Sequence, residues 1–147
     1  MDDAPEFLVD VVDGLARLLD TAGVGTYSPD GIFPPGATAI TDTVLPASTD
    51  RAVVLAAYLT QEHATLTDCT VMVQVRTRAG LDPRDVARLD GAVHAVLHGS
   101  GPWTFGTARV LLITRQSAAY IGPDGQGRHE RTSNYQLRAH QTHPKLA

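Results

Sequence analysis

The sequence has one cysteine, almost no lysine and few aromatic residues. Cys69 alone cannot form an internal disulfide or supply the sulfur ligands of a structural zinc site. No apolar run approaches the roughly 20 residues that a membrane helix needs, and the N-terminus lacks the basic and apolar segments of a signal peptide. We therefore expect a cysteine-poor, soluble domain that is made in the cytoplasm and has no membrane contact.

The composition is typical of a globular protein. The 147 residues are 43% hydrophobic and 19% charged, which excludes collagen-like, coiled-coil and wholly disordered chains. This length suits one compact domain spanning residues 1–147, with an ordered core from about residue 4 to about residue 141.

Charge is distributed unevenly along the chain. Residues 1–75 contain eleven acidic and two basic side chains, whereas residues 76–147 contain ten basic and five acidic ones. Such a division is compatible with a nucleic-acid face, with two surfaces of opposite sign that meet between subunits, or with ordinary solvated faces. The sequence leaves these three interpretations open.

Two segments have the 3.6-residue periodicity of amphipathic helices. The first covers residues 7–22 and the second covers residues 83–98. Each is preceded by residues typical of a helix start and followed by a glycine. The residues that would start and stop them are Asp3, Pro5, Glu6 and Gly23 for the first helix, and Asp82, Pro83 and Gly99 for the second.

Apolar residues that alternate with polar ones, or form short runs, predict strands. The strands expected are residues 38–45, 52–59, 70–77 and 109–115, followed by two hairpin arms at 117–121 and 132–140. The strand at 109–115 is apolar on both faces, which favours a central position. In the last arm, Tyr135 should face inward and Arg138 outward. We therefore expect an α+β fold: a largely antiparallel sheet, two helices packed on one face, and a protruding C-terminal β-hairpin.

A metal site is one hypothesis for the second helix. Asp90, His94 and His98 recur every four residues, a spacing that can direct three ligands to one ion. A small metal-dependent hydrolase would use such a set. The alternative is a helix edge with partly exposed histidines, which we favour because the sequence assigns no further ligand.

Other catalytic patterns are weak. Ser100 follows a helix, so the strand-turn-helix geometry of a nucleophile elbow is absent, and Cys69 is better interpreted as a small core residue. The glycines between residues 122 and 127 precede a strand, whereas a phosphate-binding loop needs a helix behind it. Asp124, next to a glycine, is therefore expected to form a turn rather than to bind a cation.

The most basic stretch contains Arg128, Arg131 and Arg138. These arginines could bind nucleic-acid phosphates. They could also form a polar sheet face that pairs with acidic groups of a neighbouring copy. We favour the second interpretation, because Tyr135 is expected to face inward and the isoelectric point is about 5.8.

Several segments in a fixed order resemble the tail terminator family of long-tailed bacteriophages, whose members are also called minor capsid or tail completion proteins. The resemblance covers roughly residues 6–140 and depends on order and spacing rather than on one motif. The matching pieces are LLDTAGVG, a proline-rich loop, LPASTDRAVVLAAY, TVMVQVRTRAG, DPRDVARL and IGPDGQGRHERTSNYQLR.

The resemblance implies a virion structural protein rather than an enzyme, with no cofactor. Six copies would form a ring at the head-proximal end of the tail tube, stop tube polymerisation and provide a docking surface for neck proteins. Its partners would be further copies, the major tail tube protein, neck or head-completion proteins and, transiently, DNA in the lumen. A neck or head–tail joining protein of the same virion is the alternative. Interface roles fall on Arg76, Arg78, Asp124, Arg128, Arg131 and Arg138, and on the hairpin at 122–131.

Overall fold

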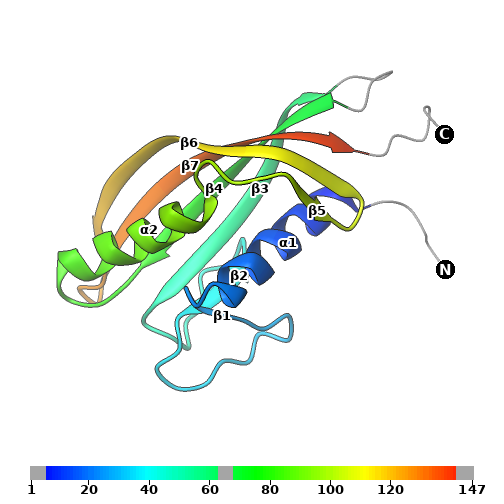
Figure 1. Ribbon diagram of the computed structural model, residues 1–147. Coiled ribbons are helices and arrows are strands. Elements are labelled where there is room, and N and C mark those ends of the chain that lie inside the picture. Colours follow the sequence, from blue (N-terminus) through cyan, green and yellow to red (C-terminus); the bar gives the residue numbers. More distant parts are fainter. Residues whose placement is uncertain (1–5, 63–67, 142–147) are drawn as a thin grey trace.

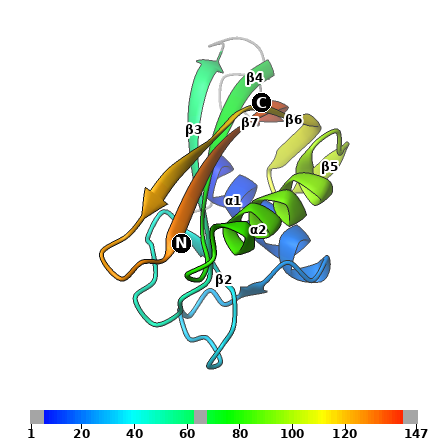
Figure 2. The ribbon, with the colours of Figure 1, turned by 90° about the vertical axis from the view of Figure 1, so that its left-hand side faces the viewer.

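The computed structural model describes residues 6–62 and 68–141. They form one curled seven-stranded sheet with two helices on one face (Figure 1). The side view in Figure 2 shows both helices on the same side of the sheet. The expected α+β architecture is therefore confirmed.

The strand order across the sheet is β1-β2-β3-β4-β7-β6-β5. Strands β1, β2 and β3 are parallel, and every other neighbouring pair is antiparallel. The short strands β1 and β5 were not foreseen from the sequence. In chain order the elements are α1 (Phe7–Thr21), β1 (Thr26–Tyr27), β2 (Ala39–Asp42), β3 (Ala52–Glu62), β4 (Asp68–Arg78), α2 (Pro83–Leu97), β5 (Trp103–Phe105), β6 (Ala108–Pro123) and β7 (His129–Gln141).

Helix α1 lies across β2 and β3 and buries its apolar stripe against them. Val11, Leu15 and Leu19 are fully buried. The helix ends just before Gly23, whose φ of 83° suits glycine and stops the helix as expected. Two of the residues proposed to start the helix, at positions 3 and 5, lie outside the described residues. Glu6 is the N-cap and makes no side-chain capping hydrogen bond.

Helix α2 packs on β4, β6 and β7 and starts as the sequence indicates. The Asp82 side chain accepts a hydrogen bond from the Arg84 backbone N–H at 2.9 Å, which satisfies one of the free amides of the first turn. Pro83 occupies the first helical position, and Gly99, with φ of 77°, follows the end of the helix. Both predicted ends are therefore confirmed.

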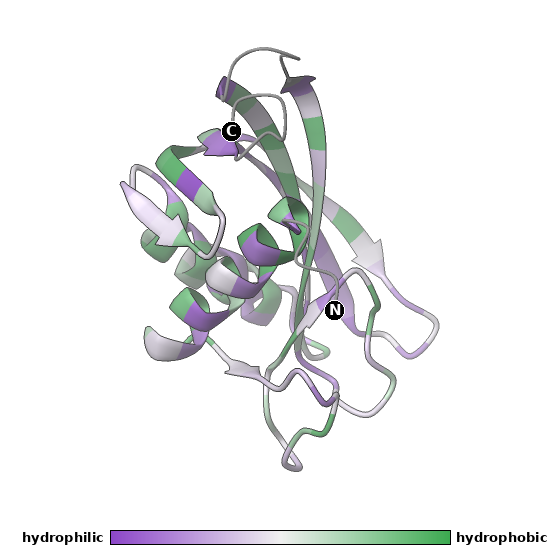
Figure 3. Ribbon diagram, turned by 90° about the vertical axis from the view of Figure 1, so that its right-hand side faces the viewer, coloured by the Kyte–Doolittle hydropathy of each residue, from purple (hydrophilic) through white to green (hydrophobic). Residues whose placement is uncertain are grey.

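The core lies between the two helices and the sheet. On β4 the inward residues Val71, Val73 and Val75 are fully buried, and on β7 Tyr135 and Leu137 are buried on the same side. This alternation follows from the two-residue repeat of a strand, and it confirms the predicted inward register of Tyr135. Figure 3 shows the matching pattern on the helices, where hydrophobic and hydrophilic segments alternate along each coil.

The expectation of a central strand at 109–115 is wrong. This segment and the predicted arm at 117–121 belong to one long strand, β6, which pairs with β7 on one side. On the other side it meets the three-residue β5 and the backbone of Gly99 and Ser100. Leu112 is exposed because it lies on the outer sheet face beside Arg138, and Leu111 is exposed at a β-bulge. Three β-bulges, at Leu111, Gln116 and Ile121, bend the strand, so that β6 and β7 arch over α2 (Figure 1).

The C-terminal hairpin is confirmed as the β6–β7 pair. Its turn is compact, because the loop between the strands spans only residues 124–128. Within the described residues, no helix is long and apolar enough to cross a membrane.

Candidate assembly interface

The hairpin turn is held together by Asp124. Its Oδ1 accepts the backbone N–H groups of Gln126 and Arg128, both at 2.9 Å, and its Oδ2 accepts Nε of Arg128 at 2.8 Å. Burial acts to raise the pKa of Asp124, but these hydrogen bonds outweigh it and the pKa is lowered. Asp124 is therefore a turn residue, as expected.

The Arg128 side chain connects the turn to a distant loop. Its Nη1 donates to Oδ1 of Asp50 at 3.2 Å, so the hairpin turn is tied to the loop that precedes β3. Only 15% of the Arg128 side chain is exposed. This ion pair ties the turn of the hairpin to the body of the domain at this point.

Arg78 is buried beneath the same loop, with 2% of its surface exposed. Its guanidinium donates to the carbonyl oxygens of Pro46 at 2.7 Å and Asp50 at 2.9 Å, and to that of Thr49. Burial lowers the pKa of Arg78 below its usual value. Its donors are directed at backbone carbonyls, so Arg78 shapes the loop from inside rather than contacting a partner directly.

The face of the sheet opposite the helices is polar. On β4 and β7 it presents Gln74, Arg76, Asn134, Gln136 and Arg138, which alternate with the buried core residues. Arg76 pairs with the buried carboxylate of Glu130, and Arg138 is exposed towards the other end of β7. This face can contact a partner through amide groups and arginines.

Arg131 lies on the helix side instead. Together with Arg115 it flanks Asp90 of α2, which is only 4% exposed. Asp90 Oδ2 is 3.4 Å from Arg115 Nη1 and 3.8 Å from Arg131 Nε, and its Oδ1 accepts the Ser133 hydroxyl at 2.7 Å. Burial, and next the Asp90 charge, raise the pKa of the neighbouring Tyr135 to about 12. This cluster fastens α2 to the hairpin.

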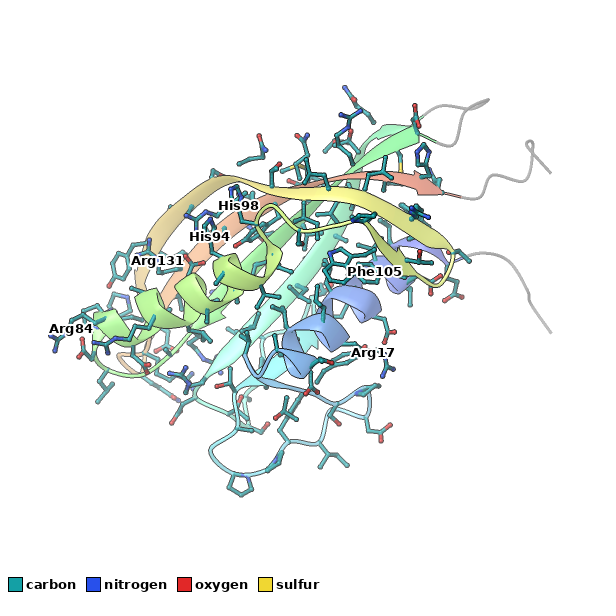
Figure 4. The ribbon with its side chains drawn as sticks, in the orientation of Figure 1. Arg17, Arg84, His94, His98, Phe105 and Arg131 are labelled. Carbon is teal, nitrogen blue, oxygen red and sulfur yellow. The ribbon has the colours of Figure 1, made fainter. Side chains whose placement is uncertain are left out.

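The histidines of α2 complete this cluster (Figure 4). The rings of His94 and His98 stack with their centroids 4.6 Å apart, and His98 Nδ1 accepts the Arg115 backbone N–H at 3.0 Å. Burial, and then the Arg115 charge, lower the pKa of His94. Among the described residues no three His, Cys, Asp or Glu side chains are placed to hold a metal ion. Asp90 and His98 are engaged with Arg115, so the hydrolase hypothesis lacks its ligand set.

A groove of about 400 Å³ lies between α1 and β5. Trp103 and Phe105 stack along it, and the lining contains no histidine or cysteine. Ser100, which precedes it in the chain, donates to Leu97 O and accepts the Trp103 Nε1–H at 3.1 Å. The Ser100 hydroxyl therefore links the end of α2 to Trp103.

The six predicted interface residues do not form one patch. Arg78, Asp124 and Arg128 gather at the hairpin turn, Arg76 lies on the outer sheet face, Arg131 lies under the arch by α2, and Arg138 lies further along β7. Two exposed apolar residues of β6 were not among the predicted interface residues: Tyr120 is 48% exposed and Ile121 is 51% exposed. The absence of any charge between residues 116 and 123 was the available signal.

The family model described as bacteriophage tail terminator protein matches residues 18–141. The chain belongs to this family. It is therefore a structural protein of a phage virion, as the order of segments indicated.

A solved chain from a structure described as the virion of a native gene transfer agent (GTA) particle has a similar fold. The TM-score is 0.62 at 13% sequence identity, and the likeness covers 90% of this chain and 95% of that chain. At this identity the comparison supports the fold alone. No curated protein matches the sequence.

Proposed function

We propose that this protein is the tail terminator of its virion and acts without catalysing a reaction. Six copies form a ring at the head-proximal end of the tail tube, stop further tube polymerisation and offer a surface to the neck proteins. The observation that supports this most strongly is the match of the tail terminator family to residues 18–141, most of the chain. No cofactor takes part.

The ring requires two different surfaces on each copy. A cyclic contact between identical subunits is heterologous, so one face of a copy meets another face of the next. The outer sheet face with Arg76 and Arg138 is one candidate for contact with a neighbouring copy or the tail tube protein. The hairpin turn with Asp124 and Arg128, shaped from inside by Arg78, is a candidate for the neck proteins.

DNA passes through the ring and touches its wall without sequence recognition. Any such contact comes from exposed arginines rather than from Arg131, whose Nε lies 3.8 Å from the buried carboxylate of Asp90. Binding of this kind weakens as salt increases.

Deletion of the gene from the phage or prophage that encodes it tests the proposal. Electron microscopy should show tails that exceed their normal length and lack heads, and expression of the protein in trans should restore normal particles. Tails of normal length without attached heads would instead indicate a neck or head–tail joining protein. Normal particles would overturn a role in the virion.

Charge reversal at an exposed position tests the surface assignment. Arg138→Glu should lower ring formation or tail binding, and this defect should grow weaker as salt is raised. Arg88→Glu, at an exposed position of α2 on the opposite side of the sheet, is the matched control for the same change of charge. Equal effects of both variants, or none, would argue against a specific role for Arg138.

A further inference from the structure

The sheet has two open edges on opposite sides. On one side, β2 covers β3 only along Ala52–Leu55, and residues 56–62 have no strand beside them among the described residues. On the other side, β5 covers β6 only along Ala108–Val110.

The segment before β5 covers the next part of β6. Ile113 exchanges hydrogen bonds with Gly99 and Ser100, at 2.7 and 3.0 Å, and the Arg115 amide donates to the His98 ring. Beyond Arg115, no backbone group of residues 6–62 and 68–141 is bonded to this side of β6.

Both open segments lack the charged side chains that often protect a sheet edge. Residues 56–61 and 116–122 contain no charged side chain, and each exposes a tyrosine, Tyr58 at 47% and Tyr120 at 48%. Natural proteins usually protect such edges with charge, proline or a covering segment. Bulges at Gln116 and Ile121 and the proline that ends β6 limit the regular open part of β6 to residues 117–120. An uncharged, exposed strand of this kind is a template for another strand.

The backbone groups that face each open edge follow from the alternation along the strand. On β6, Ile113 and Arg115 direct their amides outward, and their partners on β7 are Leu137 and Tyr135. Along β7 this alternation continues at residues 133 and 131. They lie opposite residues 118 and 120 of β6. The free amides and carbonyls of the β6 edge are therefore those of Ala118 and Tyr120.

The backbone groups of β3 alternate in the same way. The Thr43 amide donates to the Leu55 carbonyl on the side of β2. In steps of two along β3, Ala57 and Leu59 direct their backbone groups to the same side as Leu55. The β-bulge does not disturb this alternation, because it comes only after Leu59. Each open edge therefore has two residues with outward backbone groups, and the two edges match in length.

We propose that the β3 edge of one copy pairs with the β6 edge of a second copy. This inference rests on the proposed ring and names the contact that builds it. The strands run antiparallel, with Leu59 opposite Ala118 and Ala57 opposite Tyr120 of the neighbour, so that both pairs exchange N–H···O bonds. Tyr58 then lies beside Ala119 on the outer sheet face. The second copy is the occupant because one chain supplies both complementary edges.

The register sets a stagger that suits a ring. Leu59 lies level with Leu137 of β7 and Ile113 of β6 in its own copy, whereas Ala118 lies level with Ser133. The shift from Leu137 to Ser133 is four residues across the four strands β3, β4, β7 and β6, or about one residue per strand. A closed barrel whose shear number equals its number of strands has strands tilted by about 36° from the barrel axis. Successive copies can therefore continue one another without a break in the hydrogen-bond ladder.

Cysteine cross-linking between two singly substituted proteins tests this register. One protein carries Tyr58→Cys and the other carries Ala119→Cys. The two proteins are mixed and then oxidised, first in solution and then in particles that were assembled from the two variants. Cα atoms of a non-hydrogen-bonded antiparallel pair are about 4.5 Å apart, which permits a disulfide. Mass spectrometry distinguishes the new link from any formed by Cys69. We expect mixed dimers to exceed the dimers of either protein alone by at least about tenfold, because the contact is heterologous.

Other outcomes would overturn the pairing. Cross-links confined to Ala119→Cys with itself would indicate a twofold β6–β6 contact, and a link to a tail or neck protein would indicate a different occupant. Absence of any link both in solution and in particles would also overturn it. Asn134→Cys mixed with Tyr58→Cys is the control, because β7 is interior to the sheet.

A proline pair separates edge pairing from loss of folding. Ala118→Pro removes an outward amide and should lower the mixed cross-link at least about tenfold with the thermal midpoint unchanged. Ala119→Pro instead removes a bond to β7 and should destabilise the fold. Unchanged cross-linking in Ala118→Pro would overturn the register. If the gene deletion leaves particles normal while the cross-link forms, the proposed function fails and the pairing stands.

Discussion

Replacement of Arg78 by methionine would show whether this arginine holds the fold or contacts a partner. Its guanidinium is buried and donates to the carbonyls of Pro46, Thr49 and Asp50, which form the loop before β3. Methionine has a similar length but donates no hydrogen bond. We therefore expect Arg78→Met to lower the free energy of unfolding and to loosen this loop.

The expected loss is about 3 kcal/mol. The Thr49 residue is buried, and a buried carbonyl that loses its donor costs about 1–3 kcal/mol. Pro46 and Asp50 are more exposed, so their carbonyls regain water and each lost bond costs about 1 kcal/mol. Burial of the guanidinium is itself unfavourable, as the lowered pKa of Arg78 shows. Removal of this buried charge in the variant therefore offsets part of the loss. For a protein of this size, the thermal midpoint should fall by about 6–12 °C.

Urea unfolding followed by the fluorescence of Trp103 measures this loss directly. Trp103 is the only tryptophan and is half-buried against Phe105. Arg138→Met, at an exposed position, is the matched control and should change the free energy of unfolding by less than about 0.5 kcal/mol. A loss below about 1 kcal/mol in Arg78→Met, or equal losses in the two variants, would refute the structural role.

Three further predictions concern the helices. Gly14→Ala should destabilise the protein in a thermal melt, because the added Cβ would lie 2.1 Å from the Phe105 ring, whereas Gly91→Ala meets no atom within 4 Å and should stabilise it by up to about 1 kcal/mol. Asp90→Ala should cost about 2 kcal/mol in urea unfolding, since it leaves two mostly buried arginines without their buried carboxylate; a neutral effect would contradict the role of this cluster. The lowered pKa of His94 means that the unfolded chain binds its proton first, so stability should fall as the pH drops through about 6.5, and His94→Gln should reduce that slope.

The helices and the register of the last strand were predictable because their signals are local. The 3.6-residue stripe from Val11 to Leu19 and the caps at Asp82 and Gly99 depend on neighbours within a few positions. Alternation around Tyr135 likewise depends only on the two-residue repeat of a strand. The position of β6 was not predictable in this way, because Leu111 and Leu112 give the same apolar pattern whether the outer face of the sheet is covered or open to solvent.

The residues of the candidate site show the same difference between local signals and long-range contacts. Asp124 was identified as a turn residue because a side chain that accepts amides two and four residues ahead uses only local geometry. The family resemblance placed Arg78 at an interface, and the local sequence gives no sign that its guanidinium is buried. Its carbonyl partners are about thirty residues earlier in the chain.

The amino-acid sequence by itself determined the amphipathic helices, their ends, the inward face of the last strand and the order of segments that marks the family. Only the tertiary structure decided which arginines are buried, which carboxylate fastens α2 to the hairpin, and which strand edges remain open. The physical reason is that helix caps and residue periodicity arise from interactions between near neighbours in the chain. Burial, ion pairing and edge exposure arise between segments that only folding brings together.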